Sequence, residues 1–122
     1  MAVPDCQSFM LPLLKIAGDG YEHSNFEAYE ILAQQFGLNE AERTELIPSE
    51  RDRTFDNRVR WACTHLRKAF LLSSTENSKF RITERGMKLL KENPSHIDYE
   101  FLRQFPEYLT FHRSKNRRKG IK

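Results

Sequence analysis

Apolar residues recur at helical spacing along most of this 122-residue chain. The segments between these repeats are short and rich in glycine, proline, serine and asparagine, which favour turns. The pattern predicts principal helices at residues 6–17, 25–36, 40–47, 52–69 and 84–93. One or two further short helices are expected around Pro106. A mostly helical protein is therefore expected.

Residues that cap helices stand immediately before most of these segments. The predicted N-caps are Asp5, Ser24, Asn39 and Thr83. Glu42, three residues after Asn39, completes the pattern of a capping box. Gly37 follows the second helix at the position that favours a left-handed residue. In that second helix, Phe26, Tyr29 and Leu32 are expected to face the core.

Two other stretches read as extended chain. "YEH" at residues 21–23 suits a short pairing segment, and "LLSSTENSKFRI" at residues 71–82 suits a hairpin around a polar turn. A helix directly before a hairpin is the order found in a winged helix-turn-helix domain. We therefore expect a mostly α (α+β) fold of that kind, with a small two- or three-stranded wing and an extra C-terminal helix. The expected domain covers residues 1–112, and residues 113–122 form a basic tail or linker.

The helix before the hairpin has two unlike sides. At helical spacing its apolar side carries Phe55, Val59, Ala62, Cys63, Leu66, Ala69 and Phe70. Its polar side carries Arg53, Asn57, Arg60, Thr64, Arg67 and Lys68. Trp61 lies at the flank of the polar side, where packing under the short third helix or the hairpin is expected. One side thus requires a core and the other faces water or an anion.

Charge divides the chain into two halves. Residues 1–50 contain two basic and nine acidic residues, a net charge of −7, whereas residues 51–122 have a net charge of +10. A cationic half is typical of a protein that binds a polyanion, with nucleic acid the first candidate and an acidic membrane surface the second. The alternative is a dipolar surface that binds nothing.

The polar strip of this helix has the chemistry of a base-reading surface. Arginine can grip guanine or phosphate with two hydrogen bonds, asparagine can read adenine, and a threonine methyl can meet thymine. We expect Arg53, Asn57, Arg60 and Thr64 to approach base edges, with Arg67 on the same strip. Phosphate contacts are expected from Arg51, Arg58, Lys68, Lys79 and Arg81. The competing interpretation is a solvated face with salt bridges to Asp52 and Asp56.

Other chemistries have little support in the sequence. Cys6 and Cys63 form no paired motif and lie in apolar helical patterns, so buried reduced thiols are expected. The four histidines do not fall at metal-ligand spacings. A restriction-type nuclease site requires an acidic residue two positions before a lysine, and no lysine here has one. We therefore expect no enzyme activity, metal or cofactor. Because the sequence has no apolar run of membrane length, we also expect a cytoplasmic protein.

The sequence resembles the N-terminal domain of Mrr-type restriction proteins. The matching segments are "MAVPDCQSFMLPLLKIAGDG", "FDNRVRWACTHLRKAFLL", "FRITERGMKLL" and "ENPSHIDYEFLRQFPEY". The resemblance implies a winged-helix DNA reader that stands ahead of a nuclease domain and serves systems that cut foreign DNA bearing modified bases. The helix from Arg53 to Phe70 would then be the recognition helix and "SSTENSKF" the wing. Relatives often have glycine at the place of Phe70, and the nuclease half is absent here.

These observations predict a domain that binds double-stranded DNA and supplies target recognition to a nuclease in cis or in trans. One alternative is an interaction module that dimerises or docks a partner through the aromatic C-terminal segment. Its aromatic residues are Tyr99, Phe101, Phe105, Tyr108 and Phe111, which could equally cover the core. The other alternative is a DNA-binding transcription regulator, which shares the mechanism of binding. A homodimer is a further candidate assembly, and no membrane partner is expected.

Overall fold

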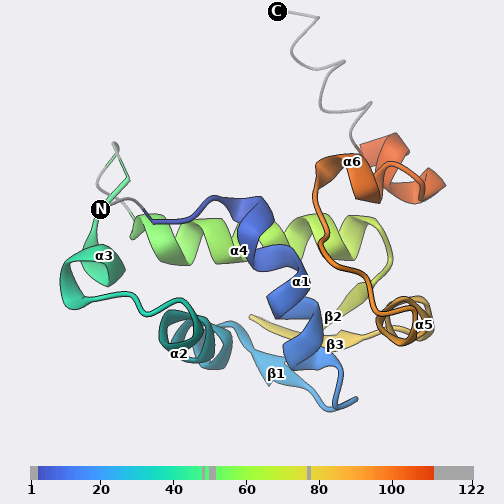
Figure 1. The fold of residues 1–122 in the computed structure, drawn as a ribbon, viewed down its shortest axis with the longest axis horizontal. Helices are drawn as coiled ribbons and strands as arrows, with labels where there is room; N and C mark the ends of the chain where they lie inside the picture. The colour runs from blue at the N-terminus through green and yellow to red at the C-terminus, as the bar shows by residue number, and fades with distance from the viewer. Residues whose placement is uncertain (1–2, 48, 50–51, 77, 112–122) are drawn as a thin grey trace, which may run out of the picture.

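A computed structural model of the chain describes residues 3–47, 49, 52–76 and 78–111. Its elements are α1 (Cys6–Ala17), β1 (His23–Ser24), α2 (Asn25–Gln35), α3 (Glu40–Thr44), α4 (Thr54–Lys68), β2 (Leu72–Glu76), β3 (Lys79–Ile82), α5 (Glu84–Lys91) and α6 (Tyr99–Leu102). Residues 106–111 are also helical. Figure 1 shows α4 as the long helix through the middle of the molecule. The predicted tail, residues 113–122, lies outside the described residues.

The three strands form one antiparallel sheet in the order β1-β3-β2. His23 of β1 pairs with Phe80, and Leu72 of β2 pairs with Ile82. The register between β2 and β3 shifts between Ser74 and Glu76, where a bulge bends the hairpin formed by these two strands. Helices with a sheet of this order confirm the expected mostly helical α+β fold of the winged-helix type.

The core lies between α4 and the elements that cross its apolar side. Figure 1 shows α1 crossing α4, and the Phe9 ring meets the Phe55 ring edge-on with 5.4 Å between centroids. Phe9, Phe55 and Leu66 are fully buried, and Phe80 carries the core into the sheet. Cys6 and Cys63 are buried and form no disulfide, as expected. Within the described residues, no helix combines the length and apolar character needed to cross a bilayer.

Local signals placed the starts of α1, α2, α3 and α5 correctly, whereas α4, which has no side-chain cap, begins at Thr54 rather than near residue 52. Asp5, Ser24 and Thr83 each accept a hydrogen bond from the backbone N–H three residues later. Asn39 and Glu42 form the predicted capping box, with bonds of 2.8 and 2.9 Å. The helix ends were less accurate, because α3 stops at Thr44 rather than near residue 47. Caps are set by the neighbouring residues, whereas a helix end also depends on what packs against it.

One predicted core residue of α2 is not buried. Tyr29 and Leu32 face the core as expected, but Phe26 in the first turn is 70% exposed. The Phe26 ring meets Tyr29 edge-on at 5.9 Å. The prediction for Phe26 was wrong because helical spacing gives the side on which a residue lies, not how far the neighbouring elements extend along it.

Candidate nucleic-acid interface

The polar strip of α4 lies on the side of the helix away from α1. Arg53, which forms the N-cap, and Lys68 at the last position are exposed. Asn57, Arg60, Thr64 and Arg67 are partly exposed. None of these six side chains is covered by the core, so the strip is accessible along the helix. Arg51, the remaining arginine before α4, lies outside the described residues.

Arg60 is held by the fold at the middle of the strip. Its guanidinium forms an ion pair with Asp52, and its Nη1 donates a 3.2 Å hydrogen bond to the hydroxyl of Tyr29. Burial raises the pKa of Tyr29, and the hydrogen bond from Arg60 opposes that rise. The salt bridge to Asp52 is the one that the competing interpretation of the strip expected. Arg60 is therefore oriented by two partners of its own chain.

Arg58 points away from the strip. Its Nη1 donates to the backbone carbonyl oxygens of Val3 at 2.5 Å and Pro4 at 3.1 Å. The guanidinium thus anchors the segment before α1 onto α4, at the flank of the apolar side. We expected Arg58 to contact phosphate, but this geometry gives it a role in holding the fold together.

A small pocket lies between the polar strip of α4 and the hairpin. Its volume is about 160 Å³, and it is lined by Asn25, Arg60, Cys63, Thr64, Arg67, Ser74, Ser78 and Lys79. The Thr64 hydroxyl donates to the Arg60 carbonyl oxygen at 3.0 Å and accepts from Nη2 of Arg67 at 3.3 Å. Burial raises the pKa of the Cys63 thiol, with Arg67 opposing the rise, so the thiol stays protonated at neutral pH. The pocket is a polar recess with cationic walls.

The hairpin is fastened to the start of α2. The backbone N–H of Asn25 donates to the Ser78 carbonyl oxygen at 2.7 Å, and the Thr75 hydroxyl donates to the Glu22 carboxylate. Nζ of Lys79 lies 3.9 Å from the same carboxylate. Lys79 and Arg81 are both exposed on β3. The hairpin therefore presents cations beside α4 while its turn is held against α2.

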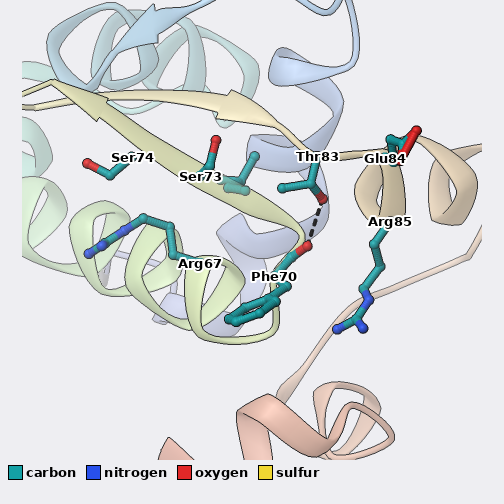
Figure 2. Close-up of a pocket in the computed structure, with 8 residues that line it drawn as sticks. Arg67, Phe70, Ser73, Ser74, Thr83, Glu84 and Arg85 are labelled. Atoms are coloured by element: carbon teal, nitrogen blue, oxygen red, sulfur yellow. Dashed lines mark hydrogen bonds between the residues drawn. The ribbon is translucent and has the colours of Figure 1, made fainter.

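A second and larger pocket opens at the end of α4, as Figure 2 shows. Its volume is about 600 Å³, and it is lined by Arg67, Phe70, Leu72, Ser73, Ser74, Thr83, Glu84 and Arg85. Arg67 and Ser74 line both pockets. The two recesses are therefore neighbours on one surface that runs along the hairpin side of α4.

Phe70 has an unusual place in this surface. Its backbone φ is 62°, and its N–H donates to the Arg67 carbonyl while that of Leu71 donates to the Leu66 carbonyl, which is a Schellman motif. Glycine suits this left-handed position, and a residue with a Cβ costs about 1 kcal/mol there. The Phe70 side chain is 54% exposed, contrary to its expected place on the apolar side. The prediction was wrong because the helix ends at Lys68 and the chain then turns the ring outward.

The other flank of α4 is covered by the C-terminal segment. His65 is buried, and its Nδ1 hydrogen-bonds with the hydroxyl of fully buried Tyr108 at 2.8 Å. Trp61 is 43% exposed and lies beside His65 of the same helix, with 6.1 Å between ring centroids, so it lacks the buried place under α3 or the hairpin that we expected. Nζ of Lys68 lies 5.4 Å from the centroid of the Phe111 ring. Phe101, Phe105 and Phe111 pack against the core, so the aromatic C-terminal residues mainly cover it.

Sequence reasoning missed part of this surface. It singled out Arg60, Thr64, Arg67 and Lys79, which the fold brings together around one pocket. It did not single out Asn25, Ser74 and Ser78, which line that pocket from two other elements. The order of elements could have pointed to Ser74 and Ser78, because both lie in the predicted hairpin. The place of Asn25 at the pocket follows from the pairing of β1 with β3, and the two residues of β1 are too few to predict that pairing from the sequence.

Comparison with known proteins agrees with this architecture. Residues 7–92 match the family model described as the Mrr N-terminal domain, and the match runs from α1 to the end of α5. Searches of curated proteins and of solved structures each returned no significant match. The family match covers more than half of the chain and includes α4 and the hairpin. The chain therefore belongs to the Mrr N-terminal domain family, which associates it with restriction systems.

Proposed function

We propose that this domain binds double-stranded DNA through the polar strip of α4 and the hairpin, and supplies target recognition to a nuclease in cis or in trans. The observation that carries the proposal is the cationic recess between α4 and β3, in which Arg60, Arg67 and Lys79 surround hydroxyl and amide side chains. A helix flanked by a hairpin can enter the major groove while the hairpin follows the backbone. The family membership supports the same role.

The proposal assigns different roles to the predicted residues. Arg67 at the recess, with Asn57 and Thr64 on the same strip, is assigned to base edges. Arg53, which we first expected at base edges, is assigned to phosphates together with Lys79 and Arg81, because all three are exposed. In this proposal Arg60 orients the strip through Asp52 and Tyr29, and Arg58 takes no part in the interface.

Salt dependence tests the proposal most directly. Each phosphate contact on duplex DNA makes the logarithm of affinity fall by roughly 0.9 per logarithmic unit of salt. Three contacts therefore give a slope of roughly −2.7. The measurement is fluorescence anisotropy of a labelled duplex, which is titrated with the protein at salt concentrations from about 50 to about 200 mM. An affinity that does not change over this range rejects the proposal.

Charge-matched variants locate the interface. Arg81→Ala removes an exposed cation from the hairpin, and Lys15→Ala removes an exposed cation from α1, which packs on the opposite side of α4. We expect Arg81→Ala to reduce the salt slope by about one unit and Lys15→Ala to leave it unchanged. Equal effects of the two variants would mean that only net charge matters.

The target of recognition is a separate question. The restriction association leads us to propose that the domain favours DNA carrying modified bases. The test compares unmodified, cytosine-methylated and adenine-methylated duplexes of one sequence in the same titration. Tighter binding to one modified duplex supports the proposal, and equal affinities would make the domain a general DNA reader. A DNA-binding transcription regulator would share the contacts, and pull-down of a nuclease encoded beside it would separate the two roles.

A further inference from the structure

The pocket at the end of α4 has chemistry that duplex binding alone does not use. Phe70 presents a half-exposed flat ring at one wall, and the fold does not require that ring because glycine suits its backbone. The about 600 Å³ volume lies in the range of small-molecule sites. An exposed aromatic face in a recess of this size offers a stacking surface for a flat ligand.

The wall opposite α4 is rigid. Nη1 of Arg85 donates to the Ala69 carbonyl at 2.9 Å and to the Glu107 carboxylate at 2.8 Å. Its guanidinium carbon lies 5.8 Å from the centroid of the Phe70 ring, and Figure 2 shows Arg85 extending from α5 and Phe70 at the end of α4. The dashed hydrogen bond in Figure 2 joins the Thr83 hydroxyl to the Phe70 carbonyl at 2.6 Å. Phe70 is therefore fixed at its backbone and faced by a held cation.

The charges around the pocket favour a neutral ring over an anion. Glu107 neutralises Arg85, and the exposed carboxylate of Glu84 lies at the rim. Glu84 can accept a hydrogen bond from an amino group, while the hydroxyls of Ser73 and Ser74 can both donate and accept. Arg67 stands at the border with the α4 recess, where a phosphate would be attracted. The arrangement fits a nucleobase that carries an exocyclic amino group and remains attached to a backbone phosphate.

We propose that this pocket receives one unstacked nucleobase with an exocyclic amino group, adenine, cytosine or guanine, of the DNA bound along α4, with Phe70 as its stacking partner. The inference rests on the proposed duplex binding, because Arg67 and Ser74 connect the pocket with the recess beside α4. Proteins that take a base out of the stack hold it between flat side chains and read its edge with hydrogen bonds. Such stacking tolerates different bases because each has a π-face.

The experiment uses the chain of 122 residues and three duplexes of one sequence. The first is fully paired, the second carries one extra unpaired adenine, and the third carries an abasic unit at the same place. The abasic duplex has the same interruption of the helix but no base to stack. We expect the protein to bind the adenine bulge about tenfold more tightly than the abasic bulge, as one stacked base allows.

The variants assign that preference to the pocket. Phe70→Ala should reduce it to less than about twofold while affinity for the paired duplex stays within about twofold, because the stacking face is lost and the strip of α4 is unchanged. Phe26→Ala, which removes another exposed phenylalanine from α2, should keep the full preference. Phe70→Gly provides a second variant, since glycine suits the backbone and cannot unfold the turn.

The outcomes separate this inference from the proposed function. Salt-dependent binding of the paired duplex with equal affinity for both bulges would overturn the nucleobase pocket and leave duplex binding intact. A preference that survives Phe70→Ala would overturn it as well. If the protein bound no duplex, NMR titration with deoxyadenosine monophosphate would decide the pocket alone: shifts confined to the amides of Ser73, Ser74 and Arg85 support it, and their absence rejects it.

Discussion

The two flanks of α4 carry similar side chains and end in different surroundings. On the hairpin flank, Arg67 borders two pockets. On the opposite flank, Lys68 lies over the Phe111 ring, and His65 is buried against Tyr108. Of two consecutive cations at the end of one helix, Arg67 therefore borders two pockets, whereas exposed Lys68 lies beside an aromatic ring of the C-terminal segment. The comparison teaches that charge on a helix identifies a binding surface only together with what packs beside it.

The covered flank should give the largest effect on stability. Tyr108 is fully buried, so Tyr108→Ala leaves a cavity beside His65 and should lower the free energy of unfolding by about 3–5 kcal/mol. Urea unfolding measures the loss. Affinity of the folded variant for duplex DNA should stay within about twofold, because the hairpin flank is untouched. A loss below about 1 kcal/mol would show that the C-terminal segment does not seal the core.

The open flank should give the largest effect on binding. Arg67→Ala should weaken duplex binding by about 1–3 kcal/mol and change the free energy of unfolding by less than about 0.5 kcal/mol. Lys68→Ala is the comparison, since it removes an exposed cation of the same strip that lies over the Phe111 ring and borders neither pocket. Anisotropy titration and urea unfolding of both variants give the two numbers. Equal losses of affinity would abolish the distinction between the flanks.

The junction of α4 with the sheet gives a smaller effect of opposite sign. Phe70→Gly should raise the free energy of unfolding by about 1 kcal/mol, because the residue has a φ of 62° and its ring is half exposed. Thermal unfolding should shift upward by about 4 °C. Phe26→Gly should instead destabilise by about 1 kcal/mol, since Phe26 lies within α2. Destabilisation by both variants would show that the Phe70 ring contributes to the core.

Protonation of His23 should stabilise the attachment of the hairpin, because His23 lies on β1 and β1 pairs with β3. Burial of His23 opposes its protonation, but hydrogen bonds at 2.7 Å with Glu27 and 2.9 Å with Asp19 outweigh burial and raise the pKa of His23 above its usual 6.5. The protonated ring therefore contributes stability that is fully present below pH about 6.5 and lost as pH rises through the folded pKa. β1 holds β3 in place, so this loss weakens the attachment of the hairpin.

The measurement compares the protein with His23→Gln in urea at several pH values. The difference in free energy of unfolding between the two proteins should shrink as pH rises above 6.5. Hydrogen exchange should show faster opening of the β3 amides at high pH, while amides near Tyr108 stay protected. A difference that grows with pH would reverse the sign and contradict the charged state of His23.

Much of the fold could be predicted because its signals are local. Ser24, Thr83 and the pair of Asn39 and Glu42 act on backbone groups three residues away, so their neighbours in sequence determine the outcome. Gly37 adopts the expected left-handed φ, at 62°. The order of elements around the hairpin followed from these boundaries and predicted the winged-helix arrangement.

The candidate site was harder to predict because it depends on distant partners. Nothing near Arg58 in sequence indicates that it will reach the carbonyls of Val3 and Pro4. Arg60 meets Tyr29 from another helix, and Phe70 leaves its helical face only because α4 ends before it. A helical wheel assigns a direction to a side chain, but tertiary packing decides which directions remain open.

The bond between the Asn25 amide and the Ser78 carbonyl has a consequence for how the domain would meet a partner. It fastens the tip of the hairpin to a helix that the core already holds, so the spacing between hairpin and α4 is set before any ligand arrives. A preorganised surface loses little conformational entropy on association. In the proposed complex with DNA, the fixed spacing between hairpin and α4 would favour a duplex whose groove width matches it.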